Sequence, residues 1–139
     1  ISNLLVHKEY RTELLLNKDL NDLMTDNPIR QVARINTVMV LRRLGNDTER
    51  KNHVLDFLRS AKLSKFILVN SNLSGTNLSS TNFYETCLAN ADLTDAYLLQ
   101  ANLRDTKSLI SEQVKNVAKN WEKAKYDLEL RNQLNLSEN

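Results

Sequence analysis

The chain contains few of the residues that break or cross-link a fold: 2 glycines, 1 proline and 1 cysteine in 139 residues. So little glycine and proline argues against disorder and long loops, and leaves little room for a glycine-rich phosphate loop. A single cysteine excludes an internal disulfide and a zinc site built from cysteines. No stretch of 18 apolar residues is present, so we expect no membrane-spanning helix in this sequence.

The charge is nearly balanced, with 19 basic and 17 acidic side chains and a net charge of +2. Residues 1–69 carry 12 basic and 8 acidic side chains, whereas residues 70–109 carry 2 and 4. A length of 139 residues and 41% hydrophobic content predict one domain with a real core. The balance gives no strong indication of a nucleic-acid partner.

What the sequence does have is a five-residue repeat, which runs through residues 71–105 as seven consecutive units. The first position of each unit is Ser, Thr or Ala, and the third is always Leu or Phe. A period of five matches neither a helix nor a strand, and a fixed repeat takes precedence over local propensity. We expect the third-position side chains to form a buried ladder, which consists of Leu73, Leu78, Phe83, Leu88, Leu93, Leu98 and Leu103.

These units resemble the pentapeptide-repeat family, whose unit is A(D/N)LXX. The resemblance implies a right-handed quadrilateral β-helix with four units per coil, so the seven units make about two coils. The predicted fold class is therefore α+β: a short β-helical solenoid with helices at its two ends. Because such a short solenoid exposes backbone and leucine side chains at both ends, the rest of the chain should cap it.

We predict three segments: an N-terminal helical cap over 1–63, the repeats over 64–109, and a C-terminal capping helix over 110–139. Before residue 28 we expect helices at about Lys8–Asn17 and Asp19–Met24. Asn27 and Pro28 then begin a helix that ends at Gly45, and Asp47 caps the next. The stretches TELLLNKDL, IRQVARINTVMVLRRLGND and VLDFLRSAKL resemble the helical domain of a group of cyanobacterial pentapeptide-repeat proteins, in which a membrane anchor often comes first.

The C-terminal segment has apolar residues at helical spacing, from Val114 through Trp121 to Leu128. It resembles the helical tail that follows many pentapeptide repeats, and Trp121 is expected to cap the last leucines. Since the chain begins with Ile1, we expect a trimmed sequence whose upstream part, an anchor included, is not visible. The location of the protein is therefore left open: soluble as given, or the soluble part of a membrane-tethered protein.

No catalytic constellation is found, and we predict no enzyme, cofactor or metal site. His7 and His53 lie in different predicted helices, and Cys87 is expected to be an ordinary surface thiol. The helix that begins at Pro28 carries four arginines, and we interpret them as a solvated surface rather than a phosphate or nucleic-acid patch: Arg30, Arg34, Arg42 and Arg43. The outward side chains that stand out are Tyr84, Tyr97 and Leu99, a candidate partner patch unless the chain's own ends cover it.

The favoured function is a non-enzymatic interaction or scaffold module that binds a protein partner or itself, with the helical part as a candidate homodimer interface. The alternative, taken from the family, is a DNA mimic that modulates a type II topoisomerase. The short solenoid and its weak local charge of −2 disfavour that alternative.

Overall fold

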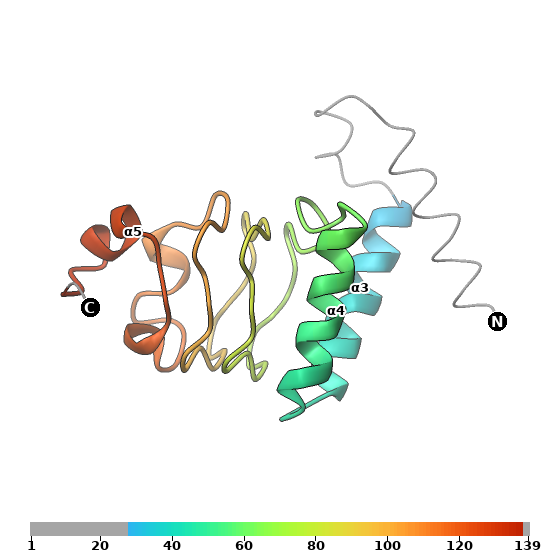
Figure 1. Ribbon diagram of the computed structural model, residues 1–139, viewed down its shortest axis with the longest axis horizontal. Coiled ribbons are helices and arrows are strands. Elements are labelled where there is room, and N and C mark those ends of the chain that lie inside the picture. The colour runs from blue at the N-terminus through green and yellow to red at the C-terminus, as the bar shows by residue number, and fades with distance from the viewer. Residues whose placement is uncertain (1–27, 138–139) are drawn as a thin grey trace.

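The computed structural model describes residues 28–137, and it has three parts along its long axis (Figure 1). Helices α3 (Pro28–Arg43) and α4 (Thr48–Ser60) lie at one end. A stack of tight turns follows, and the short helix α5 (Leu128–Gln133) lies at the other end. Two 3-10 turns, Ser111–Gln113 and Trp121–Lys123, connect the stack to α5. The helices expected before Pro28 fall outside the described residues.

The α3–α4 pair forms largely for the reasons that the sequence indicates. Pro28 is the first residue of α3, where its missing N–H costs nothing. The Asp47 side chain accepts a hydrogen bond from the backbone N–H of Arg50 and so caps the N-terminus of α4. Between the helices, Gly45 adopts φ +52°, a left-handed conformation that glycine adopts without steric strain. Buried residues on the stack side, such as Leu41, Leu55 and Leu58, then pack both helices onto the turns.

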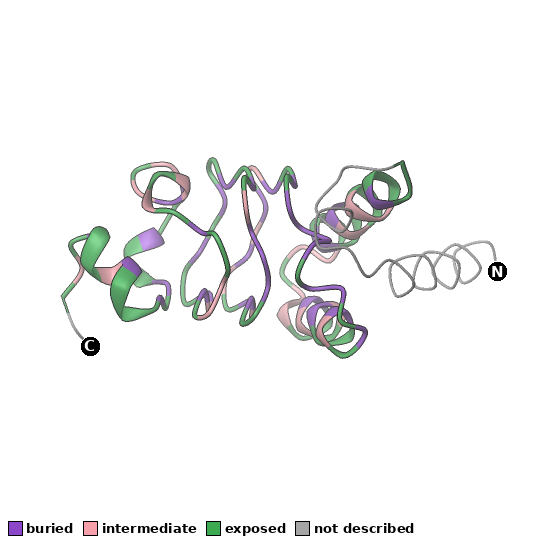
Figure 2. Ribbon diagram, turned by 90° about the horizontal axis from the view of Figure 1, so that it is seen from above, coloured by how far each residue is buried: buried purple, intermediate pink, exposed green. Residues whose placement is uncertain are grey.

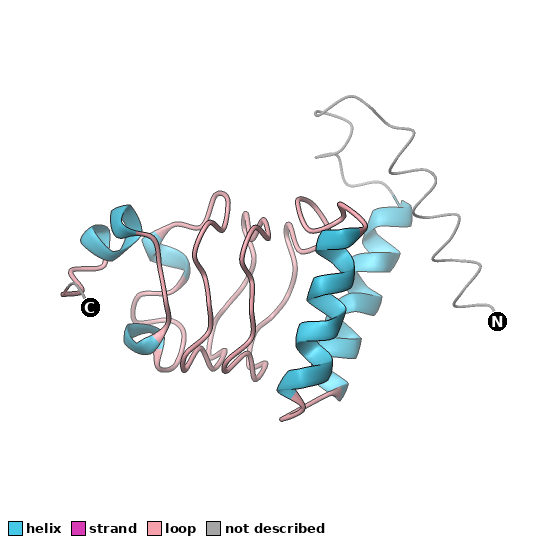
Figure 3. Cartoon of the chain, viewed as in Figure 1, coloured by secondary structure: helices cyan, strands magenta, loops and turns pink. Residues whose placement is uncertain are grey.

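The predicted β-helix is wrong as a description of this structure. Residues 28–137 contain no β-strand and no sheet, and Figure 3 draws the whole stack as loop. Successive levels are joined instead by isolated parallel bridges between residues twenty positions apart, such as Asn72 with Asp92 and Asn77 with Tyr97. The chain turns after the third residue of each five-residue unit, so only the second residue of a unit is paired with the next level. Consecutive residues are never paired, and no continuous strand forms.

The turns recur because each fifth position has a positive φ between 54° and 66°. In this conformation the Cβ of an ordinary residue crowds the backbone, so glycine and asparagine are favoured. The fifth positions of the seven units are Gly75, Ser80, Glu85, Asn90, Asp95, Gln100 and Asp105. The pattern of first and third positions does not indicate this column, whose signal in the sequence is the absence of β-branched residues.

A second local device lies at the second position of most units. There an Asn or Asp side-chain oxygen accepts a hydrogen bond from the backbone N–H two residues later, which forms an Asx turn. The distances are 3.0–3.1 Å for the pairs Asn72–Ser74, Asn77–Ser79, Asn82–Tyr84, Asp92–Thr94 and Asn102–Arg104. The same hydrogen bond, together with that from the Thr94 side chain, lowers the pKa of the Asp92 carboxyl.

The core is a continuous column of side chains inside the stack. All seven third-position residues are buried, with at most 1% of each exposed. Figure 2 shows the buried segments following the inner side of every level and continuing into α3 and α4. First-position alanines Ala96 and Ala101 are also fully buried, which lets neighbouring turns approach closely.

The predicted C-terminal helix over residues 110–139 is wrong as a single helix. Asn116 and Asn120 have φ values of +60° and +57°, which stop helical propagation. In place of a helix, Lys119 and Lys125 form bridges with Tyr97 and Asn102, so this segment adds a partial third level. A helix satisfies its own backbone, whereas an extended segment satisfies the N–H and C=O groups at the open edge of the stack. Trp121 is 9% exposed in this level, and Leu128 stays 57% exposed.

Candidate interaction surfaces

The end of the stack that faces α3 and α4 is sealed by polar side chains. The bridge of Asn72 to the next level uses Ser71 O and Leu73 N, so the Asn72 carbonyl itself points toward the helices. Arg42 donates to that carbonyl at 3.1 Å. On the next two faces Lys51 donates to Asn77 O at 2.6 Å, and Arg59 donates to Asn82 O at 3.0 Å.

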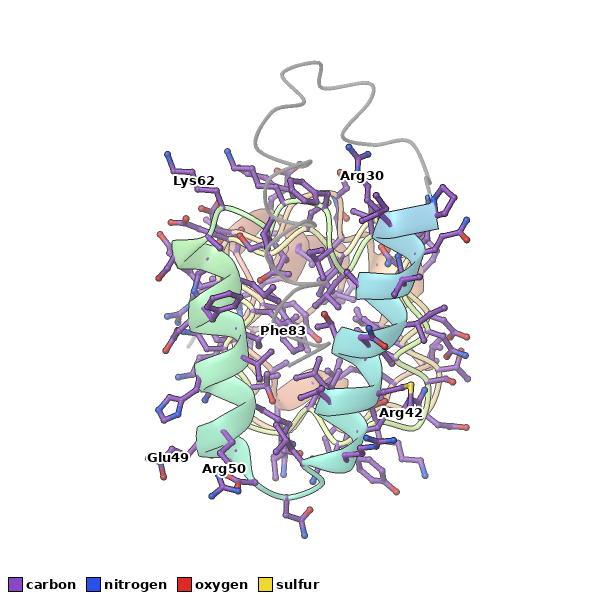
Figure 4. All side chains as sticks on the ribbon, turned by 90° about the vertical axis from the view of Figure 1, so that its right-hand side faces the viewer. Arg30, Arg42, Glu49, Arg50, Lys62 and Phe83 are labelled. Carbon is purple, nitrogen blue, oxygen red and sulfur yellow. The ribbon has the colours of Figure 1, made fainter. Side chains whose placement is uncertain are left out.

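Two further backbone groups of this edge are also paired. Asn52 accepts from Asn82 N at 2.7 Å, and Cys87 N donates to Ser64 O at 2.9 Å. Figure 4 looks at this end, with α3 and α4 side by side in front of the stack. An open edge would be a template for pairing with another chain, so this end of the stack is closed to that kind of association.

Lys51 is the central group of this closure and is fully buried. Its ammonium donates to Gly45 O and to Asn77 O, both at 2.6 Å, and so ties the α3–α4 turn to the stack. Burial lowers the pKa of Lys51, while nearby Asp47 acts in the opposite direction. This role of Lys51 has no signature in the sequence, because its partners are backbone carbonyls distant along the chain.

Two of the four arginines of α3 are engaged within the molecule. Arg30 is 3% exposed, with its guanidinium 5.7 Å from the centre of the Phe66 ring. Arg42 is used in the seal described above. The basic surface that α3 offers to a nucleic acid is therefore smaller than its four arginines indicate.

The candidate partner patch is divided between two faces of the stack. Tyr97 pairs with Asn77, whereas Tyr84 follows Asn82 on the neighbouring face. Tyr84, Tyr97 and Leu99 are 42%, 41% and 39% exposed, so no described segment covers them. Tyr97 and Leu99 belong to one unit and flank the buried Leu98, and we call them the Tyr97–Leu99 surface.

Lys119 orders the ring of Tyr97. Its ammonium lies 4.9 Å from the ring centre and 3.4 Å from the phenol oxygen. This is a cation–π contact between the second level and the partial third level. Tyr84 has no such cation–π contact within the described residues, and the negative charges of Glu85 and Asp105 raise the pKa of its phenol.

Tyr97 also departs from the local rule of the stack. Five of the second positions carry the Asn or Asp of an Asx turn, and Tyr97 carries neither group. The chain therefore gives up a side-chain hydrogen bond to the backbone here and holds an aromatic ring outward. Departures from local structural preference are concentrated at functional sites.

Cys87 is the other second-position residue that is neither Asn nor Asp. It was expected at the surface, and that expectation is wrong. Its side chain is buried, at 5% exposure, where Ser64 lies against the turn. His53 is exposed on α4, and His7 lies outside the described residues. Within residues 28–137 no group of three or more His, Cys, Asp or Glu side chains is placed to hold a metal ion.

A hollow of about 590 Å³ lies at the C-terminal end of the molecule. Its lining includes four basic side chains, Arg104, Lys123, Lys125 and Arg131, and the acidic Glu122. The Tyr126 hydroxyl donates to Trp121 O at 2.6 Å, and burial raises the pKa of that phenol. The Tyr126 hydroxyl is thus already bonded, and the other lining residues are the charged side chains named above together with Ala124 and Leu128.

The fold and these surfaces define a repeat protein whose stacked turns are closed at both ends by non-repeat segments. The family model described as Pentapeptide repeats matches residues 58–95 in 8 copies. That match includes two five-residue segments before the run, AKLSK (61–65) and FILVN (66–70), and it stops before the last two units of the run. It covers neither α3 nor the C-terminal segment, so the resemblance to the cyanobacterial group gains no support.

Comparison with curated proteins and with solved structures gave no match. None of the helices that the structure describes has both the length and the apolar composition of a membrane span.

Proposed function

We propose that this protein belongs to the pentapeptide-repeat family and is a non-enzymatic interaction module that binds a protein partner through the Tyr97–Leu99 surface. The repeat match at residues 58–95 supports the family and, with it, a role in binding. The observation that carries the choice of surface is Tyr97 itself, which replaces a turn-forming Asn or Asp with an exposed ring. Aromatic residues are enriched among those that dominate binding energy at protein interfaces.

The surface is suited to this role because its backbone is fixed before binding. Tyr97 N donates to Thr76 O at 3.0 Å, and Leu98 N donates to Lys119 O at 2.9 Å, so the unit is held from both sides. Lys119 restrains the ring as well. A rigid surface loses little conformational entropy on association, which leaves more of the contact energy for affinity.

The test compares partner capture by the wild-type chain with capture by a Tyr97→Asn, Leu99→Ser double variant. Asn and Ser are the residues that occupy the equivalent positions one level earlier, at Asn77 and Ser79, so the fold should tolerate them. Ser74→Ala with Thr94→Ala, on another face, is the matched control. We expect proteins that bind wild type and control to be lost with the double variant. Capture of the same proteins by all three chains would show that the surface is not the binding site.

A further inference from the structure

Helix α3 is apolar on two opposite sides. Val38 and Leu41 are buried against the stack, at 8% and 0% exposure. On the far side, Val32, Ile35 and Met39 are exposed, at 48%, 57% and 42%. We call these three residues the outer stripe of α3; at spacings of three and four they follow one helical face.

A helix that is apolar on both sides is typical of a middle layer. Three exposed apolar side chains in one row, on a helix whose other face already has its core, indicate a surface that is covered in the native chain. Figure 4 shows α3 from this outer side, in front of the stack.

We propose that residues 1–27 of the same chain cover the outer stripe of α3. The first argument is composition, because this segment carries apolar clusters at Leu4–Val6, Leu14–Leu16 and Leu23–Met24. These apolar side chains are of the kind that would pack against Val32, Ile35 and Met39, and this packing would leave the contacts between α3 and the stack unchanged.

The second argument is charge. Helix α3 has four arginines and no acidic residue, so it carries +4. Residues 1–27 contain five acidic side chains, Glu9, Glu13, Asp19, Asp22 and Asp26, against three basic ones, which gives −2. A second copy of α3 would bring no acidic side chain to this helix, because α3 has none. Charge therefore favours the chain's own segment over a copy of the helix.

The third argument is reach. Asn27 directly precedes the first residue of α3, so the segment is covalently attached at the end of this helix. Even in fully helical form 27 residues would span about 40 Å, against about 24 Å for the 16 residues of α3. Covalent attachment also makes the docking intramolecular, which raises the effective concentration of the segment far above that of a free partner.

The experiment measures the accessibility of the stripe in the full-length chain. An Ile35→Cys variant is treated with a thiol reagent, with Glu49→Cys on the exposed side of α4 as the reference; the native Cys87 is buried. We expect Cys at position 35 to react at least about tenfold more slowly than the reference, because docking must open first. The protection should not depend on protein concentration.

The control for the occupant adds Leu14→Asp and Leu15→Asp to the Ile35→Cys chain. We expect these changes to remove the protection of the cysteine at position 35. The control pair Asn17→Asp with Asn21→Asp adds the same charge, and we expect it to keep the protection. Circular dichroism checks that each chain is folded. Reaction at the reference rate in the unmodified segment would overturn the proposal. Protection that rises with concentration would also overturn it, since a second copy would then be the occupant.

Discussion

The ammonium of Lys51 lies 2.6 Å from the carbonyl oxygen of Asn77, so a buried cation of α4 closes the first level of the stack. The same ammonium binds Gly45 O, and the two carbonyls together replace the water that a lysine normally keeps. One side chain thus joins the helical end to the repeats.

Replacing Lys51 with Met should destabilise the protein by about 2 kcal/mol or more, because two carbonyls lose their donor inside the structure. Lys65→Met is the matched control, since Lys65 is exposed. Chemical denaturation of both variants measures the difference. Equal stability of the two would show that the seal contributes nothing.

Stability should also depend on pH through Lys51. Its pKa in the folded state is lowered by burial from 10.5, so between that lowered value and 10.5 the unfolded chain binds more protons than the folded chain. The contribution of Lys51 to the free energy of unfolding should therefore rise with pH in this window and stay constant below it. The difference in stability between wild type and Lys51→Met, measured from neutral pH upward, isolates this effect from other titrating groups.

A glycine at position 100 should stabilise the stack by about 0.5–1 kcal/mol. Gln100 has φ +59°, which crowds its Cβ, and glycine relieves this strain at some cost in chain entropy. Thr94→Gly, at a position outside the positive-φ set, should be destabilising instead. Thermal unfolding of the two variants should move in opposite directions; a shift to lower temperature for both would contradict the assignment of the corners.

Thr81 carries a buried hydroxyl that has no hydrogen-bond partner. Thr81→Val keeps the shape and removes the orphan polar group, so we expect a gain of about 1 kcal/mol in unfolding free energy. At Thr76 the hydroxyl reaches Ser74 O at 3.4 Å, so Thr76→Val should gain less. A larger gain at position 76 than at position 81 would argue against this reasoning.

Tyr97→Asn should raise stability by about 0.5–1 kcal/mol, because the new carboxamide can form the Asx turn seen at the equivalent Asn77. The same change should weaken partner binding if the proposed surface is correct. A stabilised chain with lost binding is the expected pattern where a residue is kept for function rather than for the fold. Loss of stability in calorimetry would remove this argument for Tyr97.

The periodic part of the sequence was sufficient to find the buried positions but not the hydrogen bonding between levels. Leu73 and its equivalents recur every five residues, and the structure buries each of them. The assumption that repeated pairing must produce strands failed, because left-handed corners such as Asn90 interrupt every unit.

The C-terminal prediction failed for a related reason. Val114, Trp121 and Ala124 have the spacing of a helix face, and all three are buried, yet the segment between them pairs with the stack. A hydrophobic pattern specifies which residues are buried, and here the unpaired edge of the second level decided the backbone conformation. Lys51 could not be predicted from the side-chain pattern alone, since its partners are backbone carbonyls distant along the chain.

Because neighbouring levels within the repeats are joined by the same twenty-residue offset, the repeat stack has a natural unit of growth. Insertion of one whole level of twenty residues after Asp105 would return every column to its register, and neither terminal closure would have to change. Any other length would rotate the faces relative to the ends. Relatives of different size should therefore differ by multiples of this offset, with the surface bearing Tyr97 preserved or duplicated as a unit.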